Sequence, residues 1–255
     1  MAAAGEVHAR AMALIRSKIR EGVSTRELDE GAERFIRSQG AVPSFKGYRG
    51  FPGSICASPN AMVVHGIPGP YRLRGGDIIS IDIGVTLDGW VADGACTFAV
   101  GEVSPVAAKL LEVTEASLFD AARQARAGNR VGDISWAVQS RVEDAGLSVV
   151  RSLVGHGVGR EMHEDPQIPN FGEPGRGPLL EEGMVLAIEP MVTAGRHMVR
   201  MGEDGWAIFS QDGSLAAHFE FTVAVTAEGP RILTPWHLPE AEQAPAGALS
   251  SEARS

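Results

Sequence analysis

Residues 74–101, RGGDIISIDIGVTLDGWVADGACTFAVG, decide the fold. Two runs rich in β-branched and aromatic residues flank an Asp-Gly turn signature at residues 88–89, so we expect an antiparallel hairpin. In that register Asp82 faces residue 95, and Asp93 is its diagonal neighbour on the same face. Two acids on one face repel each other unless a cation lies between them. The hairpin therefore predicts a metal site, the alternative being that an acid points to solvent at the hairpin edge.

Further acids and histidines interrupt apolar or glycine-rich segments later in the chain. Glu189 in LAIEPM and Glu220 in HFEFTV lie in strand-like runs, where glutamate is disfavoured unless its side chain faces outward. His156 in VGHGVGREMHEDP stands between glycines, and His163 follows seven residues later, a spacing that places both rings on one side of a loop or hairpin. His65 lies in the glycine- and proline-defined segment VVHGIP. A lone histidine is most often structural, but the glycines around His156 favour a functional role.

The proposed ligands are hard oxygens and one nitrogen, without sulfur. Such a set excludes a structural zinc site of the cysteine type and suits Mn, Fe, Co or Zn in a catalytic role. Five protein ligands are too many for one ion that keeps an open position, but they suit two divalent ions about 3.5–4 Å apart, bridged by carboxylates. The sequence thus predicts a two-metal hydrolase with the ligands Asp82, Asp93, His156, Glu189 and Glu220.

Composition limits the class of protein. The chain has 255 residues, of which 44% are hydrophobic and 22% charged, and a net charge of −9, which argues against nucleic-acid binding. The start, MAAAGEVHAR, has no apolar core of a signal peptide, and no apolar run reaches the length of a membrane span. Cys56 and Cys96 form no disulfide framework or CxxC motif, so we expect a reduced, cytoplasmic protein.

Periodicity and capping signals predict two helices and a set of apolar strands in each half of the chain. The segments RGGDIISID and EEGMVLAIE align as glycine, apolar run and acid, which indicates two related halves. We expect one domain over residues 1–238 and a disordered, Pro/Ala/Glu/Ser-rich tail over 239–255. The expected helices are 6–20, 24–40 (opened by a Ser24/Glu27 capping box), 105–126 and 133–145; the expected loop with short strands is 41–76; and the expected strands are 183–195, 204–210 and 215–226.

Five motifs together resemble type I methionine aminopeptidase. They are VVHGIP, IDIG followed after eight residues by Asp93, GHGVGREMHEDPQIPNFG, AIEPM and FEFTV, and the resemblance covers about residues 6–235 in order. It implies the α+β "pita-bread" fold, two pseudo-symmetric halves with antiparallel sheet around a dinuclear metal site. It also implies removal of the initiator methionine from peptides with a small second residue.

The resemblance implies individual roles for the site residues. Asp82 would chelate one ion, Asp93 and Glu220 would bridge both, and His156 and Glu189 would complete the other site. Glu189 would also shuttle protons. His163 would contact the scissile amide and stabilise the tetrahedral intermediate. The role expected of His65 is to assist from the opposite wall, near the leaving amine.

The methionine side chain would occupy an apolar pocket. Two of its positions depart from the better-known bacterial members, since Phe51 stands where tyrosine is expected and Met162 where phenylalanine is expected. Both keep the pocket apolar, which suits a thioether. Taken alone, these residues could equally be core packing. The expected pocket residues are Tyr48, Phe51, Cys56, Met162 and Trp206, with His65 and His163 beside them.

Two other interpretations stay open from the sequence. Prolidase or aminopeptidase P shares the five ligands but usually carries a separate N-terminal domain, for which this chain has no room. A non-enzymatic binding protein on the same fold would have lost metal ligands, and here all five are present. The family's cotranslational role implies nascent polypeptides and the ribosome as partners, with a monomer as the default state.

Overall fold

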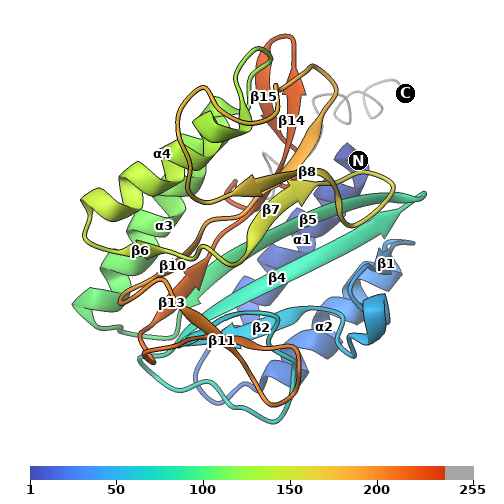
Figure 1. Ribbon diagram of the computed structural model, residues 1–255. Coiled ribbons are helices and arrows are strands. Elements are labelled where there is room, and N and C mark those ends of the chain that lie inside the picture. Colours follow the sequence, from blue (N-terminus) through green and yellow to red (C-terminus); the bar gives the residue numbers. More distant parts are fainter. Residues whose placement is uncertain (239–255) are drawn as a thin grey trace, which may run out of the picture.

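The computed structural model describes residues 1–238, and the tail expected over 239–255 lies outside them. A long hairpin of β4 (Ile78–Leu87) and β5 (Trp90–Ala99) crosses the centre of the molecule (Figure 1). The first helix, α1 (Ala2–Lys18), packs against this hairpin, and α3 (Pro105–Gln124) and α4 (Val131–Asp144) lie side by side. This is the mixed helix and antiparallel-strand architecture that the sequence predicts. The helices are α1 (Ala2–Lys18), α2 (Thr25–Ser38), α3 (Pro105–Gln124) and α4 (Val131–Asp144), with a 3-10 turn at Tyr48–Gly50.

All strand pairs between the named strands are antiparallel, and they form four sheets. One sheet holds β1, β2, β4 and β5; another has the order β15-β14-β9-β7-β8; and two small sheets have the orders β13-β10-β6 and β11-β12-β3. The strands are β1 (Val42–Pro43), β2 (Cys56–Pro59), β3 (Met62–Val64), β4 (Ile78–Leu87), β5 (Trp90–Ala99), β6 (Ser148–Val149), β7 (Val154–Gly157), β8 (Glu164–Pro169), β9 (Val185–Ile188), β10 (Met191–Thr193), β11 (Val199–Met201), β12 (Ile208–Ser210), β13 (Ala216–His218), β14 (Phe221–Thr226) and β15 (Gly229–Ile232).

Local signals set the helix boundaries. The Ser24 hydroxyl accepts from the backbone N–H of Glu27 and the Glu27 carboxylate accepts from that of Ser24, so the predicted capping box is confirmed. Ser104 caps α3, with Pro105 at its first position. The first helix starts earlier than predicted, at Ala2, because the leading alanines favour helix without a capping side chain.

Two predicted strands are each divided in the structure. Residues 183–195 form β9 and β10, and this run passes from the five-stranded sheet to a small one. Residues 215–226 form β13 and β14, and this run passes from the same small sheet to the five-stranded one. Of 204–210 only the end is a strand, because the Asp204 carboxylate accepts from the N–H groups of Trp206 and Ala207 and holds a turn. The predictions of single continuous strands were therefore wrong at these places.

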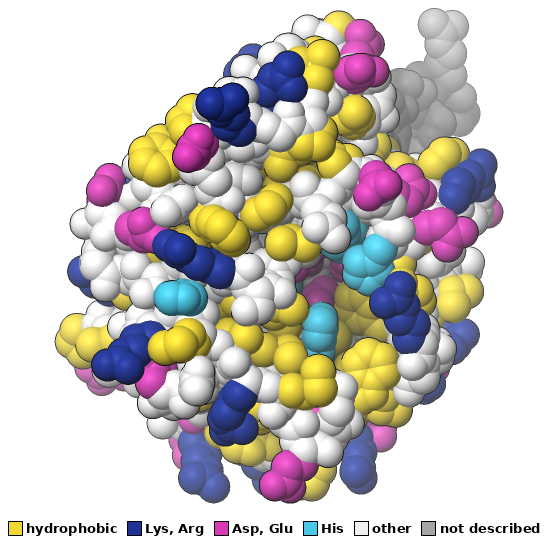
Figure 2. Space-filling model, in the orientation of Figure 1, with side chains coloured by type: hydrophobic (Ala, Val, Ile, Leu, Met, Phe, Trp, Pro, Cys, Tyr) yellow, Lys and Arg dark blue, Asp and Glu magenta, His cyan; other side chains and the backbone are white. Residues whose placement is uncertain are grey.

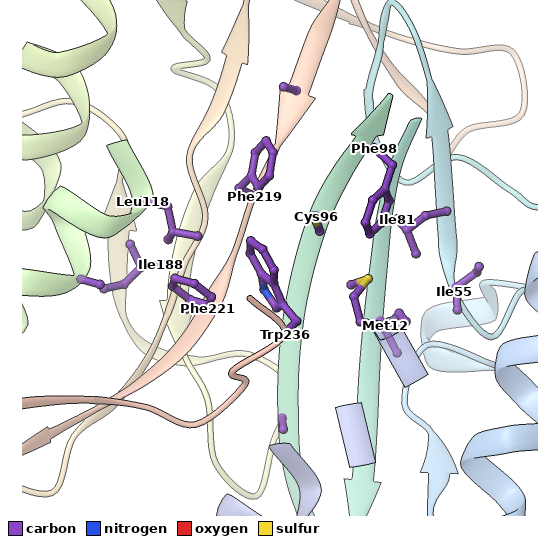
Figure 3. Close-up of a cluster of buried hydrophobic side chains, with 14 of the residues drawn as sticks. Met12, Ile55, Ile81, Cys96, Phe98, Leu118, Ile188, Phe219, Phe221 and Trp236 are labelled. Atoms are coloured by element: carbon purple, nitrogen blue, oxygen red, sulfur yellow. The ribbon is translucent and has the colours of Figure 1, made fainter. Parts of the chain in front are cut away.

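The main hydrophobic core lies between the hairpin, the helices and β14. Figure 3 shows Phe219, Phe221 and Trp236 of the C-terminal part of the chain on one side of β5, with Met12 of α1 on the other side. The Phe221 and Trp236 rings stack with their centroids 4.9 Å apart, and both are fully buried. This packing joins the two halves of the chain. No helix in residues 1–238 is long and apolar enough to cross a membrane.

Candidate metal centre

One cavity of about 180 Å³ collects the residues that the sequence singled out. It opens at the surface, where Figure 2 shows a hollow with histidines on its walls and acidic side chains within. Its lining residues come from segments that are far apart in the chain. Its lining comprises Phe45, Tyr48, Arg49, Phe51, Cys56, His65, Asp82, Asp93, His156, Met162, His163, Glu189, Trp206 and Glu220.

The hairpin register places the two aspartates as predicted. Asp82 lies opposite Ala95, and Asp93 lies opposite Gly84, two positions along on the partner strand. Both residues are buried, with exposed fractions of 8% and 4%, so the alternative of a solvent-facing acid is wrong. The absence of a side chain at Gly84 leaves room for the neighbouring Met162, whose Cε would lie 3.1 Å from an added Cβ.

Residues 93–97 of β5 run antiparallel to residues 218–222 and form the seam between the two halves. At its centre, the N–H of Glu220 donates to the carbonyl of Ala95 over 2.9 Å. At one end the Thr222 hydroxyl accepts from the N–H of Asp93 (2.9 Å) and donates to its carbonyl (2.7 Å). At the other end Thr97 does the same for His218, over 2.9 and 2.8 Å. The two threonines are a reciprocal pair of side-chain clamps, of which Thr222 fixes the backbone of Asp93 and Thr97 fixes that of His218.

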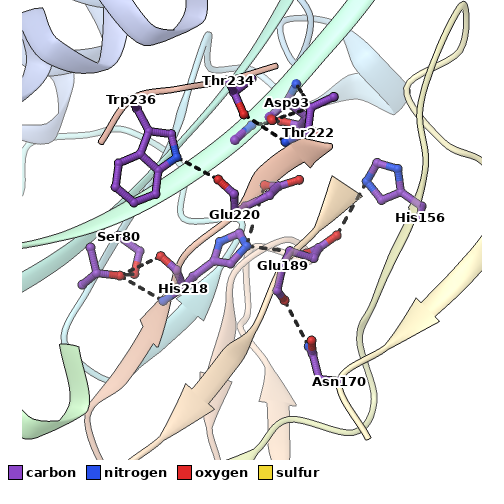
Figure 4. Close-up of polar contacts among 12 residues, drawn as sticks. Ser80, Asp93, His156, Asn170, Glu189, His218, Glu220, Thr222, Thr234 and Trp236 are labelled. Atoms are coloured by element: carbon purple, nitrogen blue, oxygen red, sulfur yellow. Dashed lines mark hydrogen bonds and ion pairs between the residues drawn. The ribbon is translucent and has the colours of Figure 1, made fainter. Parts of the chain in front are cut away.

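Glu189 and Glu220 lie where the chain changes sheets. β9 and β14 pair up to Ile188 opposite Phe221, and β10 and β13 resume with Met191 opposite His218. Pro190, which has no N–H, stands in the interruption beside Glu189. The side-chain amide of Asn170 donates to the Glu189 carbonyl over 3.0 Å and satisfies a backbone group freed there (Figure 4). The Glu220 carboxylate is fully buried, so an outward-facing position is excluded for it.

The histidines approach from the β7–β8 hairpin and from the loop after β3. The rings of His156 and His163 lie with centroids 4.3 Å apart, as the seven-residue spacing predicts. The Nδ1 of His156 donates to the Gly157 carbonyl over 2.9 Å, which leaves Nε2 as the ligating nitrogen, 3.6 Å from Glu189 Oε1. His65 also lines the cavity and adopts a left-handed φ of 59°, a strained conformation for a residue with a side chain.

Burial and mutual repulsion disfavour the ionised form of these carboxylates when no cation is bound beside them. Burial, and then the charges of Asp93 and Glu189, raises the pKa of Asp82 well above its usual value. The same causes act on Glu220, and burial followed by the charge of Asp93 acts on the pKa of Glu189. Burial raises the pKa of Asp93 to about 7, and burial lowers the pKa of His156 to about 4. A cation is the partner that would favour four ionised acids beside a neutral imidazole.

The donor set fits divalent metal. Single ligand atoms of Asp93, His156 and Glu220 lie within 4.8 Å of one another. Asp82 Oδ1 and Glu220 Oε1 are buried and make no hydrogen bond, although buried carboxylate oxygens are costly to leave unpaired. Oxygen donors with one imidazole nitrogen match Mn, Fe, Co or Zn and not a soft thiolate site. Both residues line the cavity, where a cation could pair with these oxygens.

Part of the cavity lining is apolar. Phe51 and Trp206 contact edge to face, with centroids 5.2 Å apart, and the buried Cys56 and Met162 lie beside them. These residues border an open cavity, so core packing alone does not account for them. The Tyr48 hydroxyl lies 2.8 Å from His163 Nδ1 and holds that ring at the mouth.

Sequence reasoning missed three residues here. Phe45 and Arg49 extend the cavity wall, and the Arg49 guanidinium lies 5.3 Å from the Tyr48 ring centroid. His218 lies behind the acids, with its Nε2 3.5 Å from Glu189 Oε2. His218 stands two residues before Glu220, a spacing that puts both side chains on one face of an extended segment, and this signal could have identified it.

Comparison with known proteins gives a consistent result. The model of metallopeptidase family M24 matches residues 1–227. A methionine aminopeptidase of Clostridium perfringens is 53% identical over 234 residues, which cover 92% of this chain and 94% of that protein. The crystal structure of methionine aminopeptidase from Thermotoga maritima superposes with a TM-score of 0.91 and 42% identity, covering 92% of this chain and 94% of the other.

More distant structures share only the fold. The prolidase of Pyrococcus furiosus superposes with a TM-score of 0.75 at 24% identity, over 92% of this chain but 62% of that one. The predicted pita-bread fold is thereby confirmed. The prolidase interpretation has less support, since the relatives that match this chain at high identity over nearly their full length are methionine aminopeptidases.

Proposed function

Because the chain belongs to metallopeptidase family M24, among the type I methionine aminopeptidases, we propose that it removes the initiator methionine from peptides with a small second residue. The observation that carries this proposal is the cavity itself, whose lining combines four acids with apolar and aromatic side chains. The acids suit metal-dependent hydrolysis, and the apolar part of the lining suits a methionine side chain.

We propose that two divalent ions, Co, Mn, Fe or Zn, bind here. Asp82 would hold one ion, His156 and Glu189 the other, and Asp93 and Glu220 would bridge them. When bound, the ions would supply Lewis acidity that lowers the pKa of a water for attack on the peptide carbonyl. The unpaired Asp82 and Glu220 oxygens support this assignment.

The protein's own groups would orient the peptide and move protons. Glu189, a ligand at the cavity wall, would take a proton from the attacking water and deliver it to the leaving amine. His163 Nδ1 lies 2.8 Å from the Tyr48 hydroxyl, so Nε2 can carry the proton and donate to the carbonyl oxygen. His65 would assist from the opposite wall, near the leaving amine. Glu189 thus has two roles, and its carboxylate needs a defined orientation for both.

The specificity pocket would be formed by Tyr48, Phe51, Cys56, Met162 and Trp206. Phe51 and Trp206 present ring edges and faces to the cavity, and the flexible Met162 adapts to a thioether. Fitting the first side chain here would place the following amide beside the acids. We expect the substrates to be nascent polypeptides in the cytoplasm, met at the ribosome, and the enzyme to act as a monomer through the domain formed by residues 1–238.

A peptide panel tests the proposal. Purified protein, freed of metal and then supplied with Mn²⁺ or Co²⁺, should cleave Met-Ala-Ser and leave Ala-Pro peptides intact, and EDTA should abolish turnover. Cleavage of the Ala-Pro bond in preference to Met-Ala-Ser would favour a prolidase or aminopeptidase P activity. No metal-dependent turnover of either peptide would refute the proposed hydrolase.

A further inference from the structure

His218 is a buried histidine with no part in the roles above. It ends β13 opposite Met191, only 2% exposed. Its backbone N–H donates to Thr97 Oγ1, and its carbonyl accepts from the same hydroxyl. The hydroxyl of Ser80, in β4, lies 2.8 Å from that of Thr97 and holds the Thr97 side chain in place. These hydrogen bonds fix the backbone of His218 and therefore the direction in which its side chain extends.

The ring points at two of the acids. Figure 4 shows His218 between Glu189 and Glu220, on the side of Glu189 opposite His156. Its Nε2 lies 3.5 Å from Glu189 Oε2 and 3.9 Å from Glu220 Oε2. Both distances exceed hydrogen-bond length, and this buried nitrogen makes no hydrogen bond. His218 does not line the cavity, so it approaches the acids from behind.

We propose that His218 is a positioning residue whose Nε2–H orients the Glu189 carboxylate, and that it leaves the other Glu189 oxygen for metal and proton transfer. A shift of about 0.5 Å brings the nearer contact to hydrogen-bond length. This inference rests on the proposed function, because it assigns the group that holds one of its ligands. Partners behind metal-binding residues fix their orientation and commonly change metal affinity or activity about 10- to 100-fold when removed.

The state of the ring follows from its surroundings. The ring is only 2% exposed, and a neutral imidazole carries one N–H, on either Nδ1 or Nε2. With the acids ionised around metal, two carboxylate oxygens face Nε2. A lone pair there would be repelled by both oxygens, whereas an N–H is attracted by both. The proton therefore belongs on Nε2, and the ring acts as a donor rather than as a further metal ligand.

Three variants separate positioning from packing. His218→Gln keeps an N–H near the place of Nε2, whereas His218→Leu fills similar volume without a donor. His237→Leu is the matched control, because His237 Nδ1 is also buried without a hydrogen bond but its ring contacts Phe119 and Phe221 instead of acids. Each protein is measured for Mn²⁺ affinity by calorimetry, for kcat and KM on a Met-Ala-Ser peptide, and for melting temperature.

We expect His218→Leu to lose about 10- to 100-fold in both Mn²⁺ affinity and kcat with little change in KM, and His218→Gln to recover most of this loss. His237→Leu should lower only the melting temperature. Equal defects in the Gln and Leu variants would overturn the proposal, because the donor would then be irrelevant. Wild-type affinity and kcat in His218→Leu would overturn it as well.

A spectroscopic measurement tests the tautomer independently of turnover. In Zn²⁺-loaded protein with ¹⁵N-labelled histidine, we expect the shift of His218 Nε2 to be that of a protonated ring nitrogen. An unprotonated or zinc-bound Nε2 would sink the donor role. If wild-type protein binds metal and shows the protonated nitrogen but does not cleave methionyl peptides, the proposed substrate fails while the role of His218 stands.

Discussion

The Thr222 clamp gives the sharpest test of how the site is held. Its hydroxyl satisfies both the N–H and the carbonyl of Asp93 over 2.9 and 2.7 Å, and the side chain is fully buried. Thr222→Val keeps the shape but removes both hydrogen bonds. Each of the two buried backbone groups left unpaired costs about 1–3 kcal/mol, so we expect a loss of about 2–6 kcal/mol in the free energy of unfolding. Thr222→Ser keeps the hydroxyl and should lose about 1 kcal/mol, for one buried methyl group.

Urea unfolding in EDTA measures this loss without a contribution from metal, and the denaturant dependence should stay unchanged. The control is Thr226→Val on the same strand, whose hydroxyl donates to the Gly229 carbonyl at a partly exposed turn and should cost no more than about 1 kcal/mol. Mn²⁺ calorimetry then asks whether Asp93 has moved. A Thr222→Val protein within about 0.5 kcal/mol of the wild type, with unchanged Mn²⁺ affinity, would refute the reasoning.

Three further predictions concern metal, catalysis and pH. Stripping metal with EDTA should abolish turnover and lower the melting temperature by about 5–10 °C relative to protein with metal at 100 times Kd; an unchanged melting temperature would contradict the buried metal site. His163→Ala should lower kcat about 100- to 1000-fold with little effect on Mn²⁺ affinity, and a kcat loss explained wholly by metal loss would remove its assigned role. Burial lowers the pKa of His8 from 6.5 to about 4, so between these pH values the unfolded chain binds a proton that the folded chain does not bind. The free energy of unfolding should therefore fall by up to about 3 kcal/mol as the pH drops from 6.5 toward 4. Urea unfolding across that pH range should give a shallower slope for His8→Gln, whereas parallel slopes would show that His8 does not titrate in this way.

The parts of the fold that follow local rules could be predicted from the sequence. The Asp-Gly turn sets the register of β4 and β5, and therefore where Asp82 and Asp93 stand. Capping signals at Ser24 and Ser104 set the starts of two helices. These features depend on neighbours within a few residues, which a single sequence displays.

The parts that depend on contacts between distant segments could not. The break after Ile188 and the break after His218 occur together, because β9 pairs with β14 and β10 pairs with β13. Neither run alone signals a change of sheet. For the same reason the clamps that join Thr97 to His218 and Thr222 to Asp93 are invisible in the sequence. Their partners are separated by 121 and 129 positions.

These breaks explain why the acids converge. In an unbroken strand, Glu189 would continue the ladder that pairs Ile188 with Phe221, and its backbone would be committed to that sheet. Pro190 removes a donor at this point, and the chain leaves the sheet with the carboxylate turned toward the hairpin. Glu220 is released in the same place and is anchored instead by its backbone to Ala95 of β5.

The candidate metal site and the seam between the halves are therefore formed by the same segments. Asp82 and Asp93 come from the N-terminal hairpin, while Glu189 and Glu220 come from the breaks between C-terminal strands. Asp93 and Glu220 themselves belong to the two segments, 93–97 and 218–222, that pair where the halves meet. Closing the seam brings these carboxylates together. Without a cation, the burial and mutual repulsion that raise their pKa values oppose docking of the halves at neutral pH. The threonine clamps and the aromatic core offset that repulsion. Binding of a divalent ion should reverse its sign, so that the same acids hold the halves together.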